Sequence, residues 1–189
     1  MDSRLPAAFT AAEAPNYGVT RRDLQRMLAT GEIERVGRGM YHRTDGVPLD
    51  YDLVGIAAKA HRPTLCLMSA LARHELTDVI PVAHDVALSR GTWQPRISAQ
   101  AHWHSFDPAT FEIGRDEMPV DDTHAIGIYG APRTIVDTFR LRHQVGPDVA
   151  NEALRRWLRK GGEPAEVMHI TNSFPAARPA VLHALQVLL

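Results

Sequence analysis

Residues 20–43 read TRRDLQRMLATGEIERVGRGMYHR, and this stretch decides the fold of the N-terminal part of the chain. Its first half predicts a helix. Thr20 is a good N-cap, Asp23 stands three positions on as in a capping box, and Gly31 suits the residue that follows a helix. Apolar residues recur at helical spacing at Leu24, Met27 and Leu28. The helix therefore has one narrow apolar face, and its arginines stand largely outside that face.

The second half of the stretch predicts a tight two-stranded hairpin. Apolar residues alternate with arginines around Gly37-Arg38-Gly39, a turn signal inside a strand pattern. A helix that presents arginines to solvent, followed by an arginine-tipped hairpin, is the layout of a winged helix-turn-helix, with a helix in the DNA major groove and a wing on the backbone. The predicted DNA contacts are Arg21, Arg22, Gln25, Arg26, Arg35, Arg38 and Tyr41. The alternative is an ordinary solvated amphipathic helix with a β-hairpin.

The charge of the whole chain does not by itself indicate nucleic-acid binding. The formal net charge is −1, so any such role must come from local charge. The stretch 20–43 supplies it, because it carries six arginines against three acidic residues.

Composition indicates a globular protein with a real core: 44% of the 189 residues are hydrophobic and 23% are charged. The single cysteine, Cys66, stands in an apolar run, which predicts a buried thiol and a reducing setting. No apolar run approaches the roughly 18 residues of a membrane span, and the N-terminus lacks the pattern of a signal peptide. We therefore expect a cytoplasmic protein without membrane contact.

The winged helix-turn-helix needs a helix before the arginine-bearing one. Thr10 and Glu13 predict a short helix over 10–14, opened by a capping box and ended at Pro15. Such domains usually carry a further helix ahead of this pair, where only residues 1–8 stand. The turn-rich run 44–48 after the hairpin predicts a domain boundary. We expect a DNA-binding domain over 1–46 and a second domain over 47–189.

The second domain is expected to be a mixed α/β domain, which makes the fold class α+β. The patterns predict helices at 51–61, 69–76, 134–142, 147–161, 164–172 and 176–188, and strands at 79–89, 97–106, 111–118 and 124–129. Ser69 and Thr134 are the expected caps of two of these helices, with Asp137 completing a capping box after Thr134. The prediction is a small, mainly antiparallel sheet followed by a C-terminal helical segment.

Candidate catalytic and metal sites are weak in this sequence. His102 and His104 share one face of a predicted strand, but no third ligand has recognisable spacing, so a surface or hydrogen-bonded pair is the better interpretation. Asp85 heads a set of acids (Glu75, Asp121 and Asp122) that lacks the acid–x–Lys pair of a nuclease. No phosphate-binding loop is present, which excludes a conventional kinase but leaves an unconventional phosphotransferase open. We predict no catalytic residues, no metal site and no cofactor.

A second basic cluster lies near the end of the predicted helix 147–161. It consists of Arg155, Arg156, Arg159 and Lys160. Cations at a helix C-terminus complement the helix dipole, so a solvated stabilising face is one interpretation. The other is a docking surface for an acidic protein partner or for DNA phosphates.

Several motifs together resemble the AbiEi-type antitoxin family. They are RVGRGMY at 35–41, SAL at 69–71, APRTIVD at 131–137 and VANEAL at 149–154. The resemblance runs from about residue 9 to the end of the chain. It implies a winged helix-turn-helix that represses its own operon by binding promoter DNA, with residues 20–30 as the DNA-contacting helix and 32–43 as the wing. It also implies a C-terminal domain that neutralises a nucleotidyltransferase toxin encoded next door.

The leading hypothesis is therefore a non-enzymatic antitoxin and regulator. A second hypothesis is an enzyme that inactivates its toxin covalently, for example as an atypical protein kinase that transfers phosphate to it. A third is a plain winged-helix transcription factor with a ligand-sensing C-terminal domain.

Overall fold

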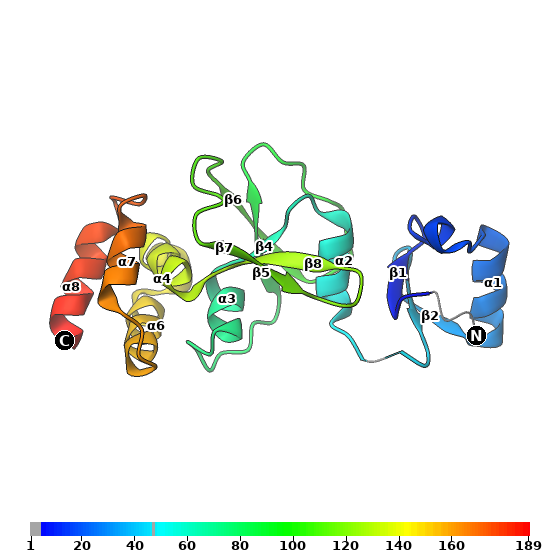
Figure 1. Cartoon of the computed structure of the whole chain (residues 1–189), viewed down its shortest axis with the longest axis horizontal. Coiled ribbons are helices and arrows are strands. Elements are labelled where there is room, and N and C mark those ends of the chain that lie inside the picture. The colour runs from blue at the N-terminus through cyan, green and yellow to red at the C-terminus, as the bar shows by residue number, and fades with distance from the viewer. Residues whose placement is uncertain (1–4, 47) are drawn as a thin grey trace. The chain divides into compact units, whose positions relative to one another are not determined.

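The computed structural model of the protein describes residues 5–46 and 48–189, and the chain forms two compact units (Figure 1). The first unit combines Met1–Pro63 with Trp93–Gln100 and Met118–Ile126. The second unit combines Thr64–Thr92 with Ala101–Glu117 and Gly127–Leu189. Together the described residues confirm the α+β class, because they form helices and two small sheets.

The first unit contains the helix and the hairpin expected from residues 20–43. In chain order its elements are β1 (Ala8–Thr10), the 3-10 helix η1 (Ala14–Tyr17), α1 (Arg21–Thr30), β2 (Ile33–Gly37) and β3 (Met40–Arg43). The capping box of α1 is formed, with Asp23 N–H donating to Thr20 Oγ1 at 3.2 Å and Thr20 N–H donating to the Asp23 carboxylate at 3.0 Å. Gly31 ends α1 in the left-handed conformation, with φ 73°. The three strands form an antiparallel sheet in the order β1-β3-β2.

The predicted helix over 10–14 is wrong. The Thr10–Glu13 capping contacts do form, but they close a turn. Glu13 Oε2 accepts from the Thr10 backbone N–H at 2.7 Å and from the Thr10 hydroxyl at 2.8 Å. Thr10 ends β1, whose buried Phe9 pairs with Tyr41 across the sheet. The helix that follows is a single 3-10 turn, because Gly18 takes the left-handed conformation at φ 73° and stops it. The described residues 5–7 form no helix either.

A helix beyond residue 46 packs on the sheet of the first unit. Helix α2 (Tyr51–Lys59) confirms the helix predicted at 51–61, and Val54 on it shares a core with Ala8 and Met40. Gly55 lets α2 come close to the sheet, since a Cβ there would lie 3.2 Å from Met40 Cε. The contacts therefore group α2 with the predicted DNA-binding segment. The predicted boundary itself falls at Val47, which lies outside the described residues, and the division of function there stays a prediction.

The second unit contains most of a mixed sheet in the order β6-β5-β4-β8-β7, of which residues 118–119 and 125–126 are grouped with the first unit. Its strands are β4 (Thr64–Leu65), β5 (His84–Ser89), β6 (Ala101–Phe106), β7 (Arg115–Pro119) and β8 (Ala125–Tyr129). The expectation of a mainly antiparallel sheet is wrong, because β4 pairs with β8 and β5 pairs with β6 in parallel. Strands β4 and β5 pair antiparallel, with Thr64 opposite Ala87. The cause of the error is β4, which is two residues long and carries no alternation of its own.

Helices form the rest of the second unit. They are α3 (Leu67–Arg73), α4 (Ala131–Arg140), α5 (Arg142–Val145), α6 (Pro147–Arg159), α7 (Pro164–Thr171) and α8 (Arg178–Leu188), and Figure 1 shows α4, α6, α7 and α8 gathered together. Their apolar faces share one core, to which Ile135, Leu154 and Val181 contribute. The helical C-terminal segment is confirmed, apart from the short α5.

Two of the predicted helix caps are wrong. Helix α3 is capped at Cys66 and α4 at Gly130, so Ser69 and Thr134 lie within the helices. Both hydroxyls make tertiary bonds instead. Ser69 Oγ accepts from the backbone N–H of Asp85 at 2.8 Å, and Thr134 Oγ1 donates to the Tyr129 carbonyl at 2.9 Å.

Candidate nucleic-acid interface

Helix α1 presents one polar face and one apolar face. Leu24 and Met27 are buried, whereas Leu28, expected in the apolar stripe, is 37% exposed. The exposed polar side chains are those of Arg21, Arg22, Gln25 and Arg26. Spacings of three and four residues place them on one side of the helix. The predicted contacts on α1 therefore reach solvent together.

The charge of this face is largely unneutralised. Arg26 lies 3.2 Å from Asp23, whereas Arg21 and Arg22 form no ion pair within the described part of the chain. Asp23 is occupied by the cap, since hydrogen bonds from the Thr20 hydroxyl and backbone N–H lower its pKa. The helix start is therefore stabilised without withdrawing the two leading arginines from solvent.

The hairpin of β2 and β3 places two further predicted contacts at its outer end. Arg35 and Arg38 are exposed, and Arg38 lies in the turn before Gly39, whose φ of +67° suits glycine. Lys59 of α2 donates to the Arg38 carbonyl at 2.9 Å and so supports the turn from behind. Arg43 has a structural role, because its guanidinium is held by the Asp45 carboxylate at 2.8 Å.

An open depression of about 770 Å³ brings three of the predicted contacts together. Arg21, Gln25 and Tyr41 all line it, beside Pro15 of η1. Tyr41 is half-buried, with its ring centroid 5.8 Å from that of Phe9. The hairpin arginines do not line this depression, so the predicted contacts form two groups: one around α1 and one at the wing.

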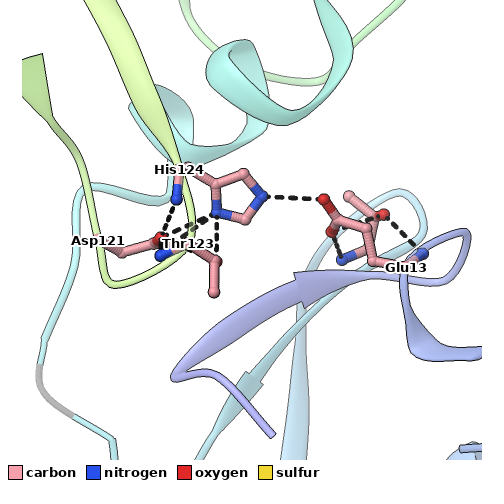
Figure 2. Close-up of polar contacts among 5 residues, drawn as sticks. Glu13, Asp121, Thr123 and His124 are labelled. Atoms are coloured by element: carbon pink, nitrogen blue, oxygen red, sulfur yellow. Dashed lines mark hydrogen bonds and ion pairs between the residues drawn. The ribbon is translucent and has the colours of Figure 1, made fainter. Parts of the chain in front are cut away.

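A buried histidine, which sequence reasoning missed, joins the segment before α1 to a later turn. We call Glu13, Asp121 and His124 the His124 latch. Figure 2 shows the His124 ring between the two carboxylates, with Nε2 lying 3.0 Å from Glu13 Oε1 and Nδ1 lying 2.9 Å from both Asp121 oxygens. The side chains of His124 and Asp121 are 7% and 3% exposed. Only the Asp121-x-x-His124 spacing hinted at the turn, and nothing indicated Glu13.

The latch favours its fully charged state. Burial by itself opposes the imidazolium, but hydrogen bonds to Asp121 and Glu13 outweigh burial and raise the pKa of His124. Burial also opposes both carboxylates, yet hydrogen bonds from Thr10 lower the pKa of Glu13, and those from Thr123 and His124 lower the pKa of Asp121. The latch connects the segment that leads into η1 and α1 to the turn at 121–124.

The second basic cluster on α6 is partly engaged within the second unit. Arg156 forms a bidentate pair with Asp78 and also bonds to Glu152 at 2.8 Å. Lys160 lies 2.6 Å from Glu75, so these two cations tie α6 to the segment after α3. Arg155 pairs with Glu152 at 2.6 Å and Arg159 is exposed. Arg155 and Arg159 are both exposed, and neither contacts the segment after α3.

The candidate chemical groups of the second unit have structural partners. His102 and His104 face Asp85, with His104 Nε2 at 2.8 Å and His102 Nδ1 at 3.7 Å from Asp85 Oδ1. His102 is exposed, whereas the side chain of His104 is 17% exposed. No group of three metal-ligating side chains is found in residues 5–46 and 48–189. Cys66 is buried, as predicted, and burial raises the pKa of its thiol.

Comparison with known protein families gives one match, in the N-terminal segment. Residues 4–44 match the AbiEi antitoxin family of transcriptional regulators. The matched residues include α1, the hairpin and every predicted DNA contact. The match confirms the resemblance for this part of the chain and indicates an antitoxin or regulator role. The motifs at 131–137 and 149–154 lie outside the AbiEi match.

No match was found among curated proteins. No helix in the described residues has the length and apolar character needed to cross a membrane.

Proposed function

We propose that the chain is an antitoxin that represses its own operon and neutralises a nucleotidyltransferase-like toxin. The observation that carries the proposal is the solvent-exposed arginine face of α1 beside an arginine-tipped hairpin, within a segment that matches AbiEi regulators. In this proposal residues 1–46 bind promoter DNA as a winged helix-turn-helix, and residues 47–189 bind the toxin.

The geometry suits groove binding. Helix α1 offers Arg21, Arg22, Gln25 and Arg26 on one side, and arginine pairs bidentately with guanine or with phosphate oxygens. Arg35 and Arg38 on the hairpin would contact the backbone of the duplex. The sheet order β1-β3-β2 places the hairpin strand β3 between β1 and β2, so β1 supports the wing along β3.

Promoter binding by an Arg22→Ala/Arg26→Ala variant tests the DNA-binding half of the proposal. Each lost phosphate contact removes about 0.9 from the slope of log affinity against log salt, so the double variant should lose up to about 2. The assay is fluorescence anisotropy with the DNA upstream of the gene, at several salt concentrations. Arg155→Ala/Arg159→Ala removes the same charge from exposed positions on α6 and serves as the control. Equal slopes for the two double variants contradict the assignment.

Toxin neutralisation is tested separately, by co-expression with the product of the neighbouring gene. The Arg22→Ala/Arg26→Ala variant should still rescue growth, because residues 47–189 are intact. Loss of rescue by the Arg22→Ala/Arg26→Ala variant, when its thermal melt matches that of wild type, would overturn the division of labour. Intact mass of the toxin after incubation with this protein and a nucleotide distinguishes a complex from covalent inactivation. If the mass of the toxin increases by one phosphate only when this protein is present, neutralisation occurs by phosphate transfer and not by a complex.

A further inference from the structure

The depression beside α1, which we call the α1 depression, has an apolar floor. Its volume of about 770 Å³ lies within the range typical of small-molecule sites. Val19 and Leu24 line it and are only 9% and 6% exposed, so their side chains form the floor. Leu28 also lines it and is 37% exposed, which leaves an apolar side chain of α1 without full cover. A ligand that fills the depression therefore removes apolar surface from water.

The α1 depression has few polar groups. Arg21 and Gln25 lie one turn apart on α1, and Tyr41 lies on β3. Thr20 lines the depression as well, but its hydroxyl is engaged with Asp23 in the helix cap. Among the described residues no acidic side chain lines the depression. An apolar hollow with one cation and no carboxylate favours an anionic ligand that has an apolar body.

Arg21 supplies the positive charge of the α1 depression. The side chain is exposed and forms no ion pair within the part of the chain that the structure describes. It stands at the first residue of α1, where the positive end of the helix dipole disfavours a cation. Helix stability therefore gives no reason for an arginine at this position. Arg22 carries the same charge but does not line the depression, so the two neighbours can be compared directly.

We propose that the α1 depression binds a small carboxylic acid with an apolar chain, with the carboxylate on Arg21 and the chain over Leu24 and Leu28. A guanidinium fork matches the two oxygens of a carboxylate, which makes arginine well suited to bind this group. Gln25 supplies a further amide donor from the next turn of α1. Binding of the acid uses residues of the first unit alone and does not depend on promoter binding.

Titration of the full chain with octanoate, followed by proton–nitrogen NMR shifts, tests the proposal. Octanoate carries both the charge and the apolar chain, octanol lacks the charge, and acetate lacks the chain. We expect saturable binding of octanoate with a Kd near or below about 1 mM, weaker binding of octanol and no saturation by acetate. The largest shifts should occur at the backbone amides of residues 19–28.

Two matched pairs of variants at exposed side chains assign the binding to the α1 depression. Arg21→Gln should weaken octanoate binding by about three- to tenfold and leave octanol unchanged, because the lost ion pair is partly exposed. Arg22→Gln removes the same charge from the same helix and should keep both affinities within about twofold of wild type, because salt screens distant charges. Leu28→Ala should weaken both ligands by about three- to fivefold, since it removes apolar contact area. Leu182→Ala changes a leucine on α8 that is 43% exposed, and it should weaken neither ligand.

The α1 depression shares Arg21, Gln25 and Tyr41 with the predicted DNA contacts, so a bound acid and promoter DNA should exclude each other. This part of the inference rests on the proposed function. Octanoate at ten times its Kd should lower promoter affinity about tenfold by competition, and an equal concentration of acetate controls for salt. If the chain does not bind the promoter, the proposed function fails, whereas the titrations still decide whether the acid binds.

Three results would each overturn the proposed site: no saturable binding of octanoate, equal affinity for octanoate and octanol, and equal effects of the two variants within either matched pair. Equal loss of promoter affinity with octanoate and with acetate would overturn the exclusion of DNA.

Discussion

Replacement of His124 by glutamine measures how strongly the His124 latch stabilises the first unit. The substitution removes the charge and at least one of the two charge-assisted bonds, each of which contributes about 1.5–3 kcal/mol. Neither carboxylate is left without a donor, because Asp121 keeps the backbone N–H groups of Thr123 and His124 and Glu13 keeps Thr10. Glu13 is also 28% exposed, which weakens its share through solvent screening. We therefore expect a loss at the lower end, about 1–2 kcal/mol.

The pH dependence of this effect has a defined sign. The raised pKa of His124 stabilises the folded state fully below the ordinary histidine value of about 6.5, and this contribution disappears as pH rises through the raised value. The lowered pKa values of Glu13 and Asp121 stabilise the folded state above about pH 4, and that contribution disappears as pH falls. The latch should therefore contribute most near pH 5–6.

Scanning calorimetry of wild type and His124→Gln between pH 4.5 and 9 is the assay. Each kcal/mol corresponds to roughly 4–8 °C in Tm for a domain of 60–100 residues. His183→Gln changes an exposed histidine on α8 and is the matched control. The reasoning fails if the two variants melt together at pH 5.5, or if the effect of His124→Gln grows between pH 6 and pH 9.

Three further predictions concern packing and charge. Arg133 is 1% exposed and bonds to Asp137, so Arg133→Leu should cost about 3–5 kcal/mol in urea unfolding, and wild-type stability would contradict the buried pair. Gly114→Ala should destabilise more than Gly39→Ala, because both glycines have positive φ but only at Gly114 would the new Cβ come within 2.8 Å of Arg133 Cβ. We expect about 1 kcal/mol for Gly39 and at least twice that for Gly114, and the reverse order in thermal melts would be inconsistent with the structure. Lys160→Ala removes an exposed ion pair with Glu75 and should lower the free energy of unfolding by less than about 1 kcal/mol. A larger loss in thermal melts would contradict this prediction.

Local patterns in the sequence predicted the elements that stabilise themselves through nearby residues. Helix α1 carries its own cap and its own terminating glycine, and the hairpin carries its own turn, so both formed as expected. Helices α6, α7 and α8 have a proline at their first or second position and follow a 3.6-residue apolar pattern, and they also formed as expected. The exposed arginines of the candidate interface follow directly from the apolar stripe of α1.

The wrong predictions concern segments whose structure depends on contacts with residues far away in the sequence. The Thr10–Glu13 box is a helix signal, but Phe9 gains more by pairing with Tyr41 in a sheet, and this pairing converts the box into a turn. The motif APRTIVD shows the same effect. Thr134 and Asp137 looked like a helix cap, yet Asp137 bonds to the buried Arg133, whose Nη1 reaches the Thr110 carbonyl at 2.8 Å. The His124 latch joins residues 111 positions apart, a separation that no local pattern encodes.

The composition of the first unit has a consequence for the order of events during synthesis. The unit needs Trp93–Gln100 and Met118–Ile126 in addition to Met1–Pro63. At about 5–20 residues per second, a ribosome needs roughly 3–13 s to extend the nascent chain from Pro63 to Ile126. During that interval Glu13 has no His124 to bond, and the arginine-bearing helix is held by an incomplete core. By then Thr64–Thr92 and Ala101–Glu117 of the second unit have also been translated, so the first unit is complete only after part of the second unit has been synthesised.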